Sequence, residues 1–127
     1  MLSINDMKNI VVEQFPEQII RIKDASDPDG DLMGHIFASR AISGPMMKLF
    51  YSDRKKFEKY CQIIELLWRE GDENIQNIIN VTVLEDLNTN ADEEVWKSLG
   101  KYFSQELKDY INNDLIHTNI LMRTVEI

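Results

Sequence analysis

The stretch of residues 71–87 constrains the fold more than any other part of the chain, because it is predicted to be one helix with a marked start. Gly71 ends the preceding element, and Asp72 is suited to the N-cap, since its carboxylate can accept a backbone N–H of the first turn. Glu73 follows where the positive end of the helix dipole favours an anion. A broad apolar sector, spaced at about 100° per residue, predicts packing on more than one side. The members of this sector are Ile75, Ile78, Ile79, Val81, Thr82 and Val83.

The remaining face of the same helix offers amide side chains rather than charges. Its members are Gln76, Asn77 and Asn80, and the acids Glu85 and Asp86 follow near the end of the helix. These groups have no catalytic pattern, but they can take part in a binding surface.

A second helix is predicted over residues 53–70, with Asp53 or the preceding serine as its N-cap. Its apolar face includes Phe57 and Trp68, which we expect to be buried. Only a Gly-Asp turn separates the two helices, so residues 53–87 should form an antiparallel hairpin. The hairpin resembles one HEAT- or armadillo-type unit, but no second copy is evident, and a full solenoid is not predicted.

Two further helix starts are marked by capping boxes, one formed by Ser3 and Asp6 and the other by Asn90 and Glu93. Pro16 should interrupt the first helix. The helices expected outside the hairpin cover residues 3–15 with a short continuation near 19–23, residues 31–42 ending at the Ser-Gly-Pro of 43–45, and residues 92–111.

The pattern therefore predicts one compact all-α domain over residues 1–127, with about five or six helices. The clearest loop is 24–31, and a polar loop precedes residue 92. The tail at 115–127 is open between a short helix, an edge strand and an ordered arm.

Charge is distributed unevenly along the chain. The net charge is -8, and residues 1–63 are neutral overall, whereas residues 64–127 hold 5 basic and 13 acidic side chains. Such a field repels nucleic acid and anionic membranes and attracts basic proteins, although the same charge also serves solubility. Between residues 70 and 94 there is no basic residue, and the acids are Glu70, Asp72, Glu73, Glu85, Asp86, Asp92, Glu93 and Glu94.

No catalytic residue, cofactor site or metal site is predicted. His35, His117 and Cys61 lack metal-ligand spacing, and Cys61 lies on the apolar face of its helix. The acids of loop 27–31 resemble the start of a calcium loop, but the turn glycine and the bidentate acid are missing. The single cysteine, the lack of a signal peptide and the short apolar runs favour the cytoplasm.

Glu106 is the one carboxylate that helical periodicity places within an apolar face. Arg40 is likewise a charged residue near the apolar face of its own helix. An ion pair between Arg40 and Glu106 would compensate the charges of both side chains. The alternative is that Glu106 lies at the edge of the face and is solvated.

Several short stretches resemble a family of small bacterial proteins. These are Glu13-Gln14-Phe15-Pro16, Gly34-His35-Ile36-Phe37, and the segments 71–77 and 81–87, within a resemblance that covers residues 13–112. Such families are often encoded beside polymorphic toxins of the contact-dependent inhibition type and are taken to be immunity proteins. The resemblance implies an inhibitor of a cognate toxin and supplies no catalytic residues.

We therefore expect a non-enzymatic immunity protein that binds and neutralises a basic toxin domain, without direct contact to nucleic acid or membrane. A helical scaffold or adaptor that binds a peptide is the alternative. Glu85, Asp86, Asp92, Glu93 and Glu94 should form one patch, with Asp72 and Glu73 at the opposite end of the helix. The residues expected to contact the partner are Asp72, Glu73, Gln76, Asn77, Asn80, Glu85, Asp86, Asp92, Glu93 and Glu94.

Overall fold

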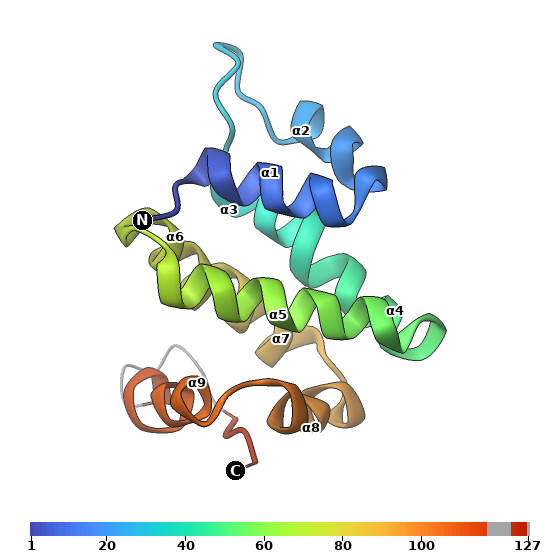
Figure 1. Cartoon of the computed structure of the whole chain (residues 1–127), viewed down its shortest axis with the longest axis vertical. Coiled ribbons are helices and arrows are strands. Elements are labelled where there is room, and N and C mark those ends of the chain that lie inside the picture. Colours follow the sequence, from blue (N-terminus) through green and yellow to red (C-terminus); the bar gives the residue numbers. More distant parts are fainter. Residues whose placement is uncertain (117–122, 127) are drawn as a thin grey trace.

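The computed structural model describes residues 1–116 and 123–126, and within these ranges the chain is helical and contains no β-strand (Figure 1). The predicted all-α fold is confirmed. Seven continuous helices occur in the described ranges, where five or six were predicted. They are α1 (Ile4–Gln14); η1 (Pro16–Ile19) with α2 (Ile20–Asp24); α3 (Gly34–Ala38), η2 (Ser39–Ser43) and α4 (Gly44–Ser52); α5 (Arg54–Glu70); α6 (Glu73–Ile78), η3 (Ile79–Val83) and α7 (Leu84–Asn90); α8 (Glu93–Tyr102); and α9 (Gln105–Asp109) with η4 (Tyr110–Leu115).

Helix α5 lies at the centre of the molecule and contacts α1, α4, α6, η3 and α8. In Figure 1 it runs between α1 on one side and α8 with α9 on the other. The Tyr60 ring stacks on Phe15 of α1's C-cap with their centroids 3.9 Å apart. Phe57 lies edge-on to Phe50 of α4 and to Tyr102 of α8. One helix therefore links the two halves of the chain through its aromatic side chains.

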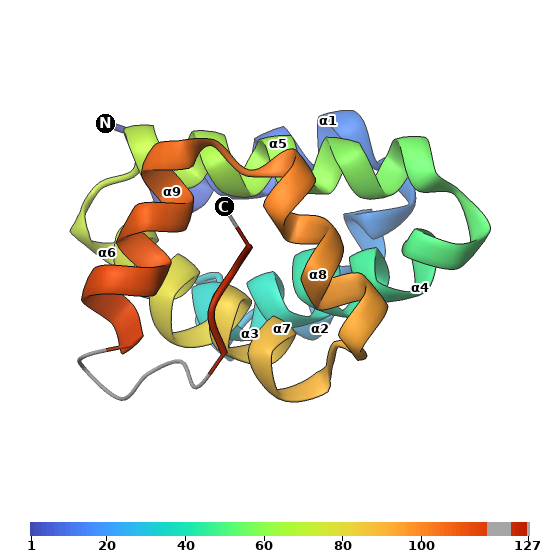
Figure 2. The same cartoon turned by 90° about the horizontal axis from the view of Figure 1, so that it is seen from below.

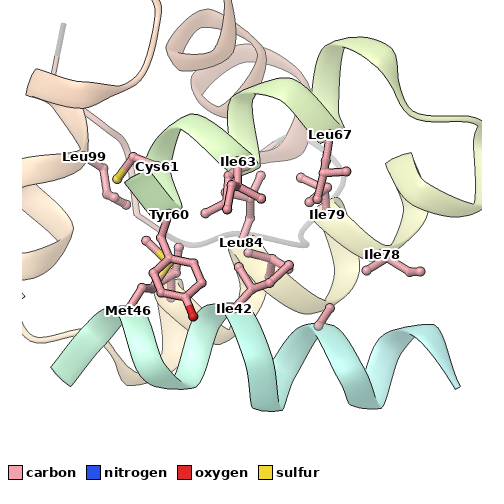
Figure 3. Packing of buried hydrophobic residues seen from close by; sticks show 14 of the residues in the cluster. Ile42, Met46, Tyr60, Cys61, Ile63, Leu67, Ile78, Ile79, Leu84 and Leu99 are labelled. Carbon is pink, nitrogen blue, oxygen red and sulfur yellow. The ribbon is translucent and has the colours of Figure 1, made fainter. Parts of the chain in front are cut away.

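The predicted antiparallel hairpin is confirmed. After α5 the chain turns at Gly71, and α6 to α7 return beneath α5 in the view of Figure 2. Asp72 is the N-cap, and its carboxylate accepts the Ile75 N–H at 2.9 Å. The β-branched run of residues 78–83 is helical, with a π turn at η3. Figure 3 shows side chains of α5, of η2 with α4, and of α6 to α7 meeting in one core, among them Tyr60, Met46 and Leu84.

Gly71 is required for space rather than for an unusual backbone conformation. Its φ of -73° is accessible to any residue. A Cβ at this position, however, would overlap Cγ2 of Ile75 and the carbonyl oxygen of Leu67. The N-terminal segment pairs with the same turn, because the Leu2 N–H donates to Glu70 O at 2.6 Å and the Asp72 N–H donates to Leu2 O at 2.8 Å.

The predicted end of the 31–42 helix at residues 43–45 is wrong. The helix begins at Gly34 and continues through Pro45 to Ser52. At the end of the π turn η2, the Gly44 N–H bonds Ser39 O, five residues back. Pro45 then lies in the first turn of α4, where the backbone N–H that proline lacks costs the helix little hydrogen bonding.

The single helix predicted over residues 92–111 is also wrong, because the chain breaks after Tyr102. Ser104 begins a new helix, since its hydroxyl accepts the Leu107 N–H at 3.1 Å. The predicted cap at Asn90 is replaced by Asp92, which accepts the Val95 N–H, whereas the Ser3–Asp6 capping box is present as predicted. Sequence periodicity did not indicate the break, because apolar residues continue at helical spacing across it.

Two predicted core positions are only partly buried. Trp68 lies at the edge of the core, while Phe57 is fully buried. Val81 is 36% exposed, because it lies at the margin of the broad apolar sector. The rest of the predicted face of α5 is buried, and Ile63 rather than Trp68 completes it; the buried residues are Phe57, Tyr60, Cys61, Ile63, Ile64 and Leu67.

Residues 123–126 of the C-terminal tail form an ordered arm that lies between α9 and α8 in Figure 2. Arg123 donates from its guanidinium to the carbonyl oxygens of Leu87, Asn88 and Ala91 at the end of α7. The same guanidinium lies 4.5 Å from the centre of the Trp96 ring.

The arm is held at two further points. Asn112 makes two hydrogen bonds with the backbone of Val125. A Cβ on Gly100 would lie 2.5 Å from Glu126 O, so this glycine leaves room for the arm. Of the three conformations left open for the tail at 115–127, residues 123–126 adopt the ordered arm, whereas Leu115 ends η4 and Ile116 is its C-cap.

We expect Gly71→Ala to lower the free energy of unfolding by about 1–3 kcal/mol, as in other overpacked sites. The physical reason is the overlap with Leu67 O, a backbone atom that cannot move aside without disturbing α5. Urea denaturation followed by far-UV circular dichroism measures the change. Asn74→Ala, at an exposed position in α6, is the control and should change stability by less than about 0.5 kcal/mol. Equal stability of the two variants would contradict this account.

We expect Arg123→Ala to destabilise the protein by about 1.5–3 kcal/mol, because three carbonyl groups lose a charged donor. Arg123→Lys should restore only part of the loss, since an ammonium group cannot reproduce the planar fork. Arg40→Ala is the matched control at an exposed position. If Arg123→Ala unfolds at the same urea concentration as Arg40→Ala, the Arg123 hydrogen bonds do not stabilise the fold.

Candidate functional site

The structure places five of the predicted contact residues around the junction of α7 and α8, which we call the acidic surface. Glu85 and Asp86 lie in the first turn of α7, and Asp92, Glu93 and Glu94 lie at the start of α8. α7 spans only about 10 Å at 1.5 Å per residue, so the two groups belong to one region. Glu85, Glu93 and Glu94 are exposed and form no hydrogen bond with a described residue through their side chains.

Asp92 serves the fold as well as the surface. Its carboxylate accepts the Val95 N–H at 2.9 Å and the Tyr51 hydroxyl at 2.5 Å. The Tyr51 hydrogen bond is the main reason why the pKa of Asp92 is lowered, with the Val95 N–H second. The same hydrogen bond raises the pKa of Tyr51 to about 12, because it favours the protonated phenol.

Asp86 also has an internal partner, because the Ser43 hydroxyl of η2 donates to it at 2.7 Å. Basic side chains approach the acidic surface from α5, α8 and the arm. Glu93 lines a hollow with Lys97 and Arg123, and Glu94 lines another with Arg54, Lys97 and Lys101. Even so, none of the acids between residues 70 and 94 forms an ion pair with a described residue.

The other end of the 73–90 helix carries Asp72 and Glu73, as predicted. Asp72 is half-buried by its role as N-cap, and Glu73 is exposed in the first turn. The helix is about 27 Å long at 1.5 Å per residue. These two acids are therefore separate from the acidic surface.

Two of the three predicted amide residues line a groove, which we call the amide groove. It lies where α5, α6 with η3, and α9 with η4 meet, and its volume is about 470 Å³. Gln76 is exposed in it and Asn80 is half-buried, whereas Asn77 is exposed and does not line it. The lining residues are Trp68, Arg69, Glu70, Gln76, Asn80, Glu106 and Tyr110.

Arg69 joins α5 to α9 on one side of the amide groove. Its Nη1 donates to Glu106 at 2.9 Å, its Nε donates to Glu65 at 3.1 Å and its Nη2 donates to the Ser104 hydroxyl at 3.1 Å. The Glu106 hydrogen bond is the main cause that raises the pKa of Arg69. Glu65 in turn accepts the N–H and the hydroxyl of Ser104.

The ion pair considered between Arg40 and Glu106 is therefore not formed. Glu106 lies in the first turn of α9, and its side chain is 72% exposed even with Arg69 bound. The break before Ser104 removed Glu106 from the apolar face on which periodicity had placed it. Arg40 is exposed and lines a separate hollow beside Arg21 and Lys48.

Aromatic and amide groups form the other side of the amide groove. The rings of Trp68 and Tyr110 are 5.4 Å apart and tilted by 43°. The Asn80 Nδ2 donates to the Tyr110 hydroxyl at 2.8 Å, while Asn80 Oδ1 is buried without a partner among the described residues. Sequence patterns could not predict that the Trp68 and Tyr110 rings lie together, because the two residues are on helices that only the tertiary fold brings together.

The histidines and the cysteine show no catalytic geometry among the described residues. The Nδ1 of His35 is 2.6 Å from the Thr82 hydroxyl, and burial raises the pKa of the Cys61 thiol. His117 lies outside the described residues. Within those residues, no group of three metal-binding side chains is close enough to hold an ion, and helices with the length and hydrophobicity of a membrane span are absent.

Comparisons with known proteins give a family but no activity. Residues 8–118 match the model of a family described as a domain of unknown function, DUF7674. Searches of curated proteins and of solved structures gave no match. None of these comparisons refers to toxins or to immunity, so that resemblance stays a prediction. Since the matched region covers most of the sequence, the chain belongs to the DUF7674 family.

Proposed function

We propose that this chain is a non-enzymatic binding domain that acts in the cytoplasm on a basic protein, and that this protein is a toxin domain which it neutralises. The observation that carries the proposal is the unpaired negative charge between residues 70 and 94. Eight acids lie there without a basic residue in the segment and without an ion pair to any described residue.

Unpaired surface charge of one sign is costly to concentrate, because like charges repel. It is useful where a partner of opposite charge must be captured, since complementary potentials raise association rates. A nucleic acid or an anionic membrane would be repelled by this surface. A basic protein is the class of partner that the acidic surface favours.

The resemblance to immunity families encoded beside polymorphic toxins is a second argument, and it favours a toxin as the basic partner. Toxin domains that act on nucleic acid are commonly basic at their active sites. An acidic inhibitor can therefore associate rapidly and cover the cleft. The alternative function, a helical adaptor, is supported by the amide groove, which could hold a peptide. The two functions differ in one outcome, because an adaptor would not protect cells against a toxin.

The direct test is a growth assay with the product of the gene that neighbours this one. We expect coexpression of the chain to restore growth to cells that produce that product, and the two purified proteins to form a complex. Growth arrest that persists while both proteins are present and folded would contradict neutralisation.

We expect Glu85→Lys, Glu93→Lys and Glu94→Lys together to slow association with the toxin by at least about tenfold at low salt, within the range known for electrostatic steering. The salt dependence of the association rate should also become shallower. Stopped-flow or surface plasmon resonance measurements across a salt series give both quantities. Asp86 and Asp92 are left unchanged, because each holds a hydrogen bond within the fold.

The matched control reverses Glu13, Glu17 and Asp29, which are exposed and lie away from α7 and α8. It changes the net charge by the same amount, so only the position of the charges differs. If both triple variants slow association equally, the net charge governs binding and the acidic surface has no special role.

A further inference from the structure

We propose that the amide groove receives an arginine side chain of the basic partner. This inference rests on the proposed function and adds to it a second, more specific contact. The acidic surface supplies long-range attraction, whereas the groove offers a site of defined shape, with a volume of about 470 Å³, between three helices.

The charges of the groove favour a cation. Glu70 and Glu106 are exposed carboxylates on its lining, and Arg69 is the lining cation among the described residues. Arg69 is already engaged, because its Nε, Nη1 and Nη2 donate to Glu65, Glu106 and Ser104. Neither an ion pair nor a side-chain hydrogen bond to a described residue engages Glu70, so its charge is available to a partner. Since Glu106 is paired with Arg69, the uncompensated charge on the lining is that of Glu70, and it would repel a phosphate or carboxylate ligand.

The aromatic side chains favour arginine over lysine. A guanidinium group is planar and weakly hydrated, and it stacks on aromatic faces more readily than an ammonium group does. Trp68 and Tyr110 present two tilted rings in the groove. The Trp68 ring already lies 5.6 Å from the guanidinium carbon of Arg69, so a guanidinium is compatible with its surroundings.

The amides supply acceptors for the N–H groups of a guanidinium. Gln76 is exposed on the lining, and its side-chain oxygen can accept directly. Asn80 Oδ1 is a buried acceptor without a donor among the described residues. Turning the Asn80 amide over would place its NH₂ group there instead, and that group would then be the unpaired one. With the amide oriented as in the structure, a donor that reaches Oδ1 satisfies an acceptor that is costly to leave unpaired, and because Oδ1 is buried, the covering side chains must move for this contact to form.

Asn80 and Tyr110 both lie in π turns, η3 and η4, and their side chains bond to each other across the groove. A π turn inserts an extra residue into a helix and is common at functional sites. Here the two turns bring an amide and a phenol together at the meeting point of two helices. The same turns also bury core residues, Ile79 and Val83 in η3 and Ile111 and Leu115 in η4.

The experiment is an NMR titration of the ¹⁵N-labelled protein with N-acetyl-arginine amide. The chain has two tryptophans, and their indole N–H signals are independent reporters. Trp68 lines the amide groove, whereas the Trp96 indole is bound to Thr124 O at 2.8 Å and lines a different hollow. A Trp68→Phe variant assigns the two signals.

We expect the Trp68 signal to shift and saturate with N-acetyl-arginine amide in the millimolar range, while the Trp96 signal stays in place. The citrulline and glutamate amides should give no saturable shift, and the lysine amide a weaker one, because they lack the charge or the planar group. A Trp68 signal that does not move, or that moves equally with the glutamate amide, overturns the proposal.

Variants link the titration to the partner. Glu70→Lys with Gln76→Lys should abolish the Trp68 shift and weaken the toxin complex by at least about tenfold, as for a central arginine contact. Glu13→Lys with Gln14→Lys carries the same substitutions at exposed positions of α1 and should change neither. Wild-type affinity of the groove variant for the toxin overturns the arginine contact but leaves neutralisation standing. A Trp68 shift in a protein that fails to protect cells overturns neutralisation alone.

Discussion

The burial of α5 on several sides is the constraint on which the rest of the structure depends. Each large apolar side chain that it buries contributes roughly 1.5–3 kcal/mol, and these contributions are shared with α1, α4, α6 and α8. Phe57 alone contacts aromatic rings from α4 and α8. A helix held in this way has little freedom to rotate or to slide. Its last turn, which carries Trp68 and Arg69, is therefore fixed against η3 and η4.

The polar contacts of the last turn of α5 are weaker but more specific. Surface ion pairs contribute about 0–1 kcal/mol each, so Arg69 with Glu65 and Glu106 cannot hold the fold together. Their geometry instead determines where α9 lies, because Glu65 binds both the N–H and the hydroxyl of its N-cap, Ser104. The core thus sets the distance between the helices, and the polar network sets the register that forms the amide groove.

What the sequence could predict was local. The caps Ser3, Asp53 and Asp72 and the apolar face of α5 depend on residues a few positions apart, and the structure confirms them. The helix break at Ser104 was missed because apolar residues continue at helical spacing across it, and because the Ser104 cap is also held by Glu65, far away in the sequence. The acids of the acidic surface were placed correctly along the chain, but their hydrogen bonds to Ser43 and Tyr51 come from another helix. The groove required both Trp68 and Tyr110, which no local pattern connects.

The two candidate surfaces lie along one helix, and this arrangement limits how a partner could use them. Asn80 and Glu85 are about 8 Å apart along the helix axis at 1.5 Å per residue. A standard interface covers about 800 Å² on each partner, which corresponds to roughly 30 Å across. The spacing of the two surfaces along the helix axis is therefore within the span of one partner of ordinary size. Since α6 to α7 is packed against α5, the spacing between the two surfaces is fixed before binding. A rigid spacing lowers the entropy cost of a second contact once the first has formed.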